Sequence, residues 1–231
     1  MYESRKMTEP IAIYGSGGFG RETLILIHQL NDSFVDAHFW PYGMLGFYDD
    51  TKPKGDIVAG WPIIGSIDDL NAATEPIAIA LCIGNSLTRF SARLKIRNKN
   101  VSFPVLIHPS VNTGLSSDNK IGEGSIICAG TVITTNVEIG EFVIINLNCT
   151  VGHDAKIDNF ASLMPGVHVS GNVHVKQGAY IGTGAVLLPG VTIGVGATVG
   201  AGAVVTKDVP DRETWIGVPA KPVVHQDPKF F

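Results

Sequence analysis

His153 and Asp154 are adjacent residues whose side chains can together move a proton. A near-neutral imidazole can act as a general base, and a neighbouring carboxylate can orient the ring and raise its basicity. A lone surface histidine is as often without function, and Asp154 also fills a position where a turn favours Asp. The pair indicates an acid–base site if the element that carries it holds it at an open surface.

A glycine-rich segment, Gly15–Gly20, is the second candidate for chemistry. It matches the pattern G-x-G-x-x-G between a strand-like run at 11–14 and a helical pattern at 21–30. Backbone amides at the start of such a helix can bind phosphate. The acidic residues at the end of the second expected strand, Asp49 and Asp50, come later than in a dinucleotide site. The segment therefore favours the diphosphate of a nucleotide sugar over NAD, with a turn that serves only tight packing as the alternative.

The element that must position His153 is a run of fifteen six-residue repeats from Ile121 to Pro210. The first position is Ile, Val or Leu, and the fifth is Ser, Thr, Val, Cys or Ala. The fourth is Gly, Asn or Asp except at Phe142 and Phe160, and it suits a turn with positive φ. The first and fifth positions can point inward because side chains two apart share a face. Three turns close a coil of 18 residues, so the repeats predict a parallel β-helix of five coils.

Positions within the repeat indicate which side chains face outward. His153 is a third-position residue on a turn and should project from the surface. Cys149 is a fifth-position residue and should point inward, which disfavours covalent catalysis. Residues 18 apart stack, and neither His168 nor His174 has a histidine above or below it, so no metal site is expected within one chain.

Residues 10–104 should form a small parallel α/β (Rossmann-like) domain, because strand and helix patterns alternate there. Strands are expected at 11–14, 44–48, 61–65 and 77–83, and helices at 21–30, from 66, and at 86–98. Residues 1–9 should be a flexible tail and 105–210 the β-helix, with a loop at 113–120. Residues 211–231 should cap the open end of the β-helix, whose bare strand edges would otherwise invite aggregation.

Composition narrows the class of protein. The chain has 231 residues, a net charge of −4 and no basic stripe, which disfavours nucleic-acid binding. Its three cysteines are expected to be buried free thiols in a reducing cytoplasm. We expect no signal peptide and no membrane span, because the start is not followed by a long apolar run.

Taken together, these segments resemble the sugar O-acyltransferase branch of the hexapeptide-repeat acyltransferases. That branch includes sialic acid O-acetyltransferases and N-acetyltransferases of UDP-4-amino-4,6-dideoxy sugars. The resemblance covers nearly the whole chain and is carried by residues 13–22, 46–50, 83–85, 146–154 and 215–221. It implies a left-handed β-helix and a homotrimer, with acetyl-CoA in a groove between neighbouring prisms, in a bacterial cytoplasmic protein.

The resemblance also implies roles for particular residues. His153 would be the general base and Asp154 its orienter, with Asn146 near the same corner. Acetyl-CoA would lie near Ser162, Gly182, Thr183 and Ala201, with Lys207 or Lys221 beside its phosphates. The sugar nucleotide would be held by Gly18, Phe19, Gly20, Asp49, Asp50 and Gly84. Phe19 stands where related enzymes often have His, so the acceptor is open between a UDP-amino sugar and another sugar.

The leading function is transfer of an acetyl group from acetyl-CoA to an amine or hydroxyl of a sugar, free or linked to a nucleotide. One alternative is a metal-dependent lyase of the carbonic anhydrase type on the same β-helix. A second is a trimer that binds sugar nucleotides without catalysis, which the His153–Asp154 pair disfavours. Longer acyl donors are also compatible with the sequence.

Overall fold

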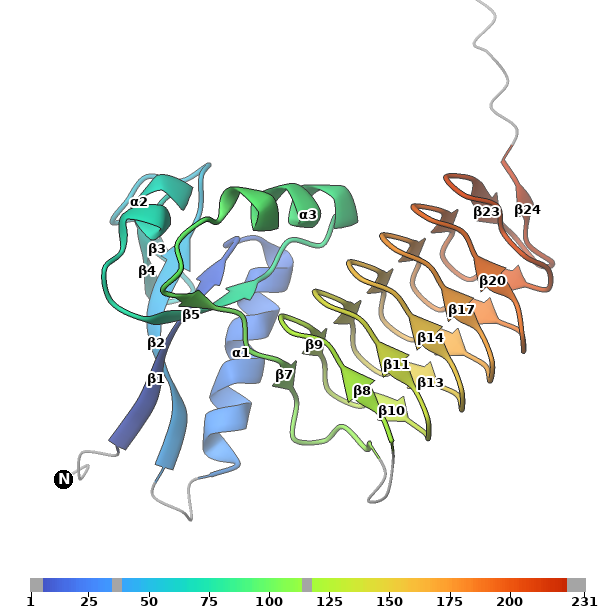
Figure 1. The fold of residues 1–231 in the computed structure, drawn as a ribbon, viewed down its shortest axis with the longest axis horizontal. Helices are drawn as coiled ribbons and strands as arrows, with labels where there is room; N and C mark the ends of the chain where they lie inside the picture. Colours follow the sequence, from blue (N-terminus) through green and yellow to red (C-terminus); the bar gives the residue numbers. More distant parts are fainter. Residues whose placement is uncertain (1–5, 35–38, 114–117, 224–231) are drawn as a thin grey trace, which may run out of the picture.

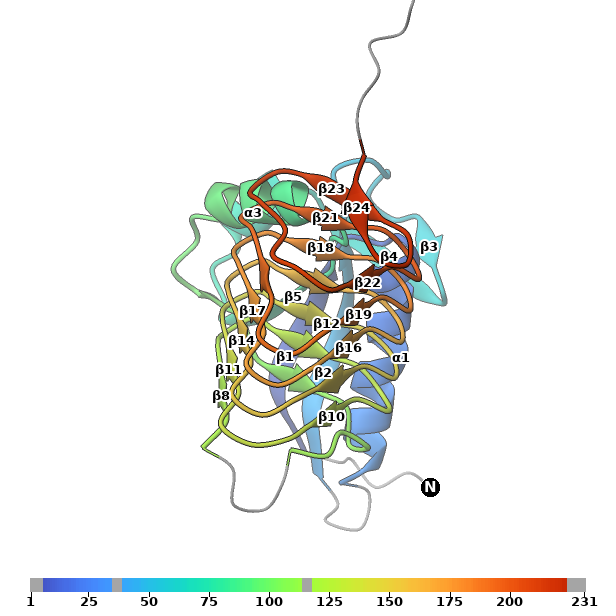
Figure 2. The same ribbon diagram turned by 90° about the vertical axis from the view of Figure 1, so that its right-hand side faces the viewer.

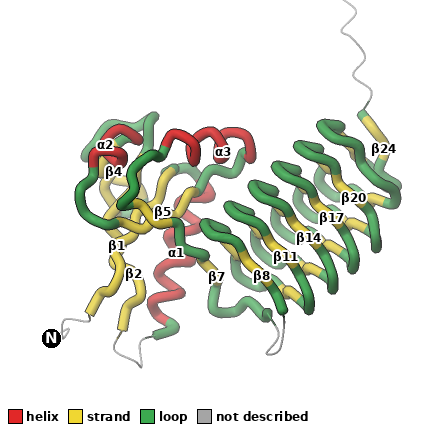
Figure 3. Tube along the Cα trace, in the orientation of Figure 1, coloured by secondary structure: helices red, strands yellow, loops and turns green. Residues whose placement is uncertain are grey.

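The computed structural model describes residues 6–34, 39–113 and 118–223. They form an α/β domain followed by a long β-helix, which extends from the domain as a three-sided prism (Figure 1). Figure 3 shows that helices occur only in the first part, while the prism consists of short strands separated by turns. No helix in the described ranges is long and apolar enough to cross a membrane.

The α/β domain is built on a sheet with strand order β3-β4-β2-β1-β5-β6. Every pair is parallel except β3–β4, as the alternating pattern predicted. The strands are β1 (Lys6–Tyr14), β2 (Phe39–Tyr48), β3 (Ile57–Val58), β4 (Trp61–Gly65), β5 (Ile77–Leu81) and β6 (Val101–Ser102). The helices are α1 (Gly18–Asp32), α2 (Ile67–Ala72) and α3 (Ser86–Lys95).

Several boundaries differ from the sequence prediction. Residues 6–9, expected in a flexible tail, belong to β1, and β2 begins at Phe39 rather than at 44. The two strands extend together through parallel main-chain pairing that begins with Lys6 opposite Phe39. Helix α3 ends at Lys95, because Ile96 leaves the helical conformation and is 5% exposed. Of the expected loop at 113–120, residues 114–117 lie outside the described ranges and Lys120 is in a strand.

The β-helix has three faces, which we number by their order in space. Face I contains β7 (Leu106–Ile107), β9 (Ile126–Ile127), β12 (Ile144–Ile145), β15 (Ser162–Leu163), β18 (Tyr180–Ile181), β21 (Thr198–Val199), β23 (Thr214–Ile216) and β24 (Lys221–Pro222). Face II contains β10 (Val132–Ile133), β13 (Thr150–Val151), β16 (His168–Val169), β19 (Val186–Leu187) and β22 (Val204–Val205). Face III contains β8 (Lys120–Ile121), β11 (Glu138–Ile139), β14 (Lys156–Ile157), β17 (His174–Val175) and β20 (Thr192–Ile193).

The coils are 18 residues long and wind to the left. On face II, Thr150 pairs with His168 and His168 with Val186. In Figure 2 the C-terminal coils are nearest to the viewer, and the chain passes clockwise from β17 through β18 to β19 as it advances. This left-handed winding opposes the usual right-handed crossover. At the far end, β23 continues face I and β24 folds back against it, so that the expected cap is present up to residue 223.

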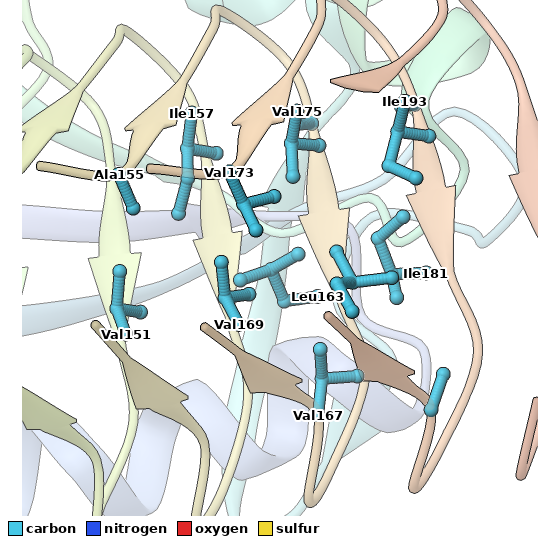
Figure 4. Close-up of a cluster of buried hydrophobic side chains, with 14 of the residues drawn as sticks. Val151, Ala155, Ile157, Leu163, Val167, Val169, Val173, Val175, Ile181 and Ile193 are labelled. Atoms are coloured by element: carbon cyan, nitrogen blue, oxygen red, sulfur yellow. The ribbon is translucent and has the colours of Figure 1, made fainter. Parts of the chain in front are cut away.

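The interior of the prism is filled by the first and fifth positions of the repeat, as predicted. Figure 4 shows these side chains packed between the faces, and all of those it labels are buried. The two aromatic exceptions, Phe142 and Phe160, adopt φ 53° and 60°. Their rings stack with centroids 5.1 Å apart, and Phe90 of α3 packs edge-on against Phe160. This packing against the α/β domain compensates for the unfavourable backbone conformation.

Arg89 joins the two domains from a buried position. Its side chain is 1% exposed, and its guanidinium donates to the carbonyl oxygens of Phe142 (3.0 Å) and Phe160 (2.7 Å) in the prism. It also donates to the carbonyl oxygens of Ile83 (2.6 Å) and Gly84 (3.1 Å) after β5. Arg89 therefore fixes the loop that follows β5 relative to the β-helix.

Candidate active site

His153 and Asp154 lie on the turn between β13 and β14, at the corner where face II meets face III. His153 Nδ1 is 2.7 Å from Asp154 Oδ2, and the two side chains are 59% and 44% exposed. Hydrogen bonds from Asn136 and then from His153 lower the pKa of the Asp154 carboxyl, so it is ionised at neutral pH. An ionised carboxylate can only accept, so the proton of the neutral imidazole is assigned to Nδ1, and the lone pair of Nε2 can accept a proton from a donor.

Gly171 lies one coil beyond His153, directly against its ring. A Cβ at position 171 would lie 2.5 Å from His153 Nε2, so only glycine accommodates the ring where it stands. Gly171 is 18 residues beyond His153, and residues 18 apart stack, but Gly171 was not among the predicted site residues. Lys207 is three coils beyond His153 at the same corner, about 14 Å away by the spacing of strands.

Three of the residues expected near acetyl-CoA gather at a different corner, between faces I and II. Gly182 and Thr183 follow β18, and Ala201 follows β21 one coil later. Thr183 and Ala201 are exposed, and the Thr183 carbonyl accepts a hydrogen bond of 2.8 Å from the Gly202 amide. Lys221 is exposed on β24. The expected cofactor residues thus lie at two corners, except Ser162 on β15 and Lys221 on β24.

Ser162 is wrong as a cofactor-binding residue. It is 0% exposed, and its hydroxyl accepts from Arg89 (2.9 Å) and donates to the Gly84 carbonyl (3.3 Å). It points outward from face I as the repeat requires, but α3 covers this part of the face.

Asn146 does not share the His153 corner within one chain. It precedes β13 and His153 follows it, so the two residues stand at opposite edges of face II. Asn146 is also 6% exposed, and its Oδ1 accepts from the Leu147 amide at 2.7 Å.

The glycine-rich segment forms a tight turn from β1 into α1. Gly15 has φ 101°, and a Cβ at Gly20 would lie 1.9 Å from the Gly15 carbonyl oxygen. Helix α1 begins at Gly18 without a side-chain cap and without an acidic residue in its first turn. The amides of Gly18, Phe19 and Gly20 therefore belong to a helix start suited to an anion.

Asp49 braces this turn and has no capacity left for substrate. Its Oδ2 accepts from the Ser16 amide (2.9 Å) and hydroxyl (2.5 Å), and its Oδ1 accepts from the Thr51 amide (2.9 Å) and hydroxyl (2.6 Å). Burial would raise the pKa of Asp49, but these four hydrogen bonds outweigh it and lower the pKa to about 2. A carboxylate has about four acceptor sites, so the expected direct contact of Asp49 with substrate is wrong.

Asp50 lies beside a small cavity at the carboxyl ends of the strands. Its oxygens accept from Tyr14 Oη (2.6 Å) and the Ile67 amide (2.8 Å), which leaves about two acceptor sites. The cavity has a volume of about 300 Å³, and Lys95 of α3 contributes a cation to its wall. Nothing in the sequence pattern set Lys95 apart from the other basic residues of this helix.

Gly84 separates that cavity from a larger hollow on the other side of α3. The hollow has a volume of about 860 Å³ and runs from Gly84 and Asn85 along Phe90 to Tyr180 and Arg212. The carboxyl ends of the strands and α3 lie at the top of Figures 1 and 2, whereas the turns joining face II to face III lie at the bottom. In one chain, the glycine-rich turn and His153 are therefore on opposite sides.

The cysteines are unsuited to nucleophilic catalysis. All three are buried and free, as expected. Burial raises the pKa of Cys82 and of Cys128 to about 12 and that of Cys149 to about 11, so thiolates are absent at neutral pH.

Two other histidines of the prism, His168 and His174, each lie beside a polar side chain. His168 Nδ1 lies 2.9 Å from Thr150 Oγ1, and His174 Nε2 lies 2.9 Å from Asp158 Oδ2. Within the part of the chain that the structure describes, no three His, Cys, Asp or Glu side chains are grouped to hold a metal ion.

The left-handed β-helix of six-residue repeats, with a His–Asp pair at an exposed corner, defines a hexapeptide-repeat acyltransferase. Residues 10–93 match the PglD N-terminal domain family. The chain is 33% identical over 159 residues, 69% of each protein, to GDP-perosamine N-acetyltransferase of Escherichia coli O157:H7. It belongs to this family of β-helix sugar acetyltransferases.

Solved structures agree over almost the whole chain. The acetyltransferase domain of PglB from Neisseria gonorrhoeae FA1090, in complex with acetyl coenzyme A, is 33% identical with a TM-score of 0.81, over 93% of this chain and 99% of that one. PerB from Caulobacter crescentus, in complex with CoA and GDP-perosamine, is 30% identical with a TM-score of 0.78, over 93% of this chain and 97% of that one.

Proposed function

We propose that this protein transfers an acetyl group from acetyl-CoA to the amine of a nucleotide-linked sugar, with His153 as the general base. The observation that carries the proposal is the 2.7 Å contact between His153 Nδ1 and Asp154 Oδ2 on an exposed corner. It leaves Nε2 free to take a proton. The relatives named for GDP-perosamine and acetyl coenzyme A support both substrates.

The chemistry is direct transfer. The acceptor amine attacks the thioester carbonyl and gives a proton to His153 Nε2 as the new C–N bond forms. The tetrahedral intermediate then collapses, the C–S bond breaks, and the departing thiolate takes the proton from the imidazolium. Asp154 holds the ring in position and stabilises its charged form between these steps.

The α/β domain holds the acceptor. The start of α1 at Gly18, Phe19 and Gly20 binds the diphosphate, and the cavity at Asp50 and Lys95 takes the base. The sugar extends past Gly84 into the larger hollow beside α3. Along the corner of His153, Lys207 binds a phosphate of the CoA.

The active unit is a homotrimer whose sites lie between chains. With face II of each chain towards a common axis, the His153 corner of one chain meets the corner of its neighbour that carries Thr183 and Ala201. The neighbour also supplies Asn146 and the acceptor-binding surface above its face I. The opposite placement of the glycine-rich turn and His153 in one chain supports this arrangement.

The test is release of CoA thiol from acetyl-CoA with a panel of UDP-, GDP- and dTDP-linked 4-amino-4,6-dideoxy sugars and sialic acid, with a control lacking acceptor. Turnover with one nucleotide-linked amine and none with sialic acid is the expected result. Binding of nucleotide sugar without binding of acetyl-CoA would favour a non-catalytic protein instead. Light scattering on the same preparation should give the mass of three chains.

Replacing Gly171 with alanine should lower kcat by about tenfold or more, because the new Cβ would lie 2.5 Å from His153 Nε2 and displace the ring. The melting temperature should change little, since neighbouring coils carry Thr135 and Pro189 at the equivalent position. Steady-state kinetics and thermal unfolding measure the two effects. A variant with normal kcat would show that the ring does not work from this position.

A further inference from the structure

Asn136 makes a contact that its backbone position does not require. It lies one coil before Asp154 at the same corner, and its Nδ2 donates to Asp154 Oδ1 at 2.6 Å. The other oxygen of that carboxylate, Oδ2, faces His153 Nδ1 at 2.7 Å. Asn136, Asp154 and His153 thus form a continuous chain of hydrogen bonds across two coils.

The turn conformation alone does not explain why residue 136 is asparagine. Asn136 has φ 56°, and equivalent turns of the prism use Gly166 (φ 69°) and Gly190 (φ 77°) for the same conformation. Glycine adopts this conformation at less cost than any other residue. The side chain of Asn136 therefore contributes its hydrogen bond to Asp154 beyond what the turn requires.

The Asp154 carboxylate needs such a partner to orient a ring. It stands on an exposed turn, and the terminal torsion of an Asp side chain is broad, so one surface contact with His153 would not fix its plane. A donor on Oδ1 holds the plane in which Oδ2 meets Nδ1. Gly171 bounds the Nε2 edge of the imidazole from the next coil, so the ring is held between Asp154 on one side and Gly171 on the other.

We infer that Asn136 is a positioning residue for acetyl transfer: its amide holds the Asp154 carboxylate, which selects the Nδ1–H tautomer of His153. This inference rests on the proposed role of His153 as the base. It extends the functional unit from two residues to three, in two successive coils.

Two variants test the inference without disturbing the turn. Asn136→Gly keeps the positive φ and removes the donor. Asn136→Asp keeps the size but places an acceptor against Asp154. In both we expect kcat to fall by about tenfold, the worth of one hydrogen bond, with KM for both substrates within about twofold. ¹⁵N NMR of histidine-labelled protein should show the Nε2–H tautomer of His153 rising in both.

The matched control is Asn148→Gly, which makes the same change in the same turn slot (φ 56°) at another corner. It should keep the wild-type tautomer of His153, and its melting temperature should match that of Asn136→Gly. A wild-type tautomer in both Asn136 variants would overturn the inference, as would a normal kcat in both. Full activity of His153→Ala would instead refute the proposed base, while the tautomer measurement would still decide whether Asn136 positions the ring.

Discussion

Replacing His153 with alanine should lower kcat by about 10²- to 10⁴-fold, the usual contribution of a general base. The acceptor amine then loses its proton to water, while binding of both substrates to the rest of the site is retained. KM for acetyl-CoA and for the sugar nucleotide should therefore stay within about threefold of wild type. Steady-state measurement of thiol release with the accepted sugar gives both constants.

A matched control for His153→Ala exists on the next face of the prism. His174 forms a second His–Asp pair, with Nε2 2.9 Å from Asp158 Oδ2 on face III. His174→Ala removes the same side chain from a similar partner and should keep kcat within about twofold. If His153→Ala were as active as His174→Ala, His153 would not be the base.

Asp154→Asn tests the role of the ionised carboxylate beside His153. The amide keeps the size and the turn conformation but replaces the ionised acceptor with a neutral group. It no longer stabilises the imidazolium or selects the Nδ1–H tautomer, so kcat should fall without a change in KM.

The repeat was predictable because its period is a direct consequence of geometry. The side chain of a residue in the first or fifth position points into the prism, and a residue in the fourth position adopts the turn conformation. The position of His153 at an open corner follows from the same rule. The rule also pairs residues 18 apart, so the proximity of Asn136, Asp154 and Gly171 was available in principle. What the spacing lacks is the direction of each side chain on the turn, which the structure supplies.

Predictions failed where the outcome depends on a second element that packs against the predicted one or pairs with it. Ser162 occupies an outward position of the repeat, yet α3 covers it, and nothing within the repeat reports what packs against a face. Strands β1 and β2 extend beyond the predicted segments through backbone pairing, which needs no particular side chain. Asp49 has the residue type expected of a substrate ligand, but its acceptor sites are filled by Ser16 and Thr51. In each case the outcome depends on contacts between segments far apart in the sequence.

Arg89 is the clearest example of a residue whose environment depends on contacts between distant segments. A basic residue in an amphipathic helix is usually solvated, and the sequence offered no reason to place it inside. The structure buries it, and burial lowers the pKa of its guanidinium to about 10, so it remains charged at neutral pH. Its partners are backbone carbonyl oxygens and the Ser162 hydroxyl. Their dipoles stabilise the buried charge, which a carboxylate would otherwise compensate.

Replacing Arg89 with methionine should destabilise the protein by about 3–5 kcal/mol, the cost of breaking a buried charged network. Methionine fills much of the volume but leaves the carbonyls of Phe142 and Phe160 without their donor. The measurement is the free energy of unfolding in urea at fixed protein concentration, since a trimer would make it concentration-dependent. Arg97→Met, at an exposed position just after the same helix, is the control and should change stability by less than about 0.5 kcal/mol.

The same substitution should also weaken acceptor binding, because Arg89 holds the Ile83 and Gly84 carbonyls against the prism. Once this tie is lost, the loop after β5 can move relative to the β-helix, and the sugar nucleotide must order it on binding. KM for the sugar nucleotide should rise more than KM for acetyl-CoA. A variant as stable as Arg97→Met would show that water replaces the guanidinium and that packing of Phe90, Phe142 and Phe160 alone joins the domains. A loss of stability with unchanged KM would show that Arg89 stabilises the fold but does not position the acceptor site.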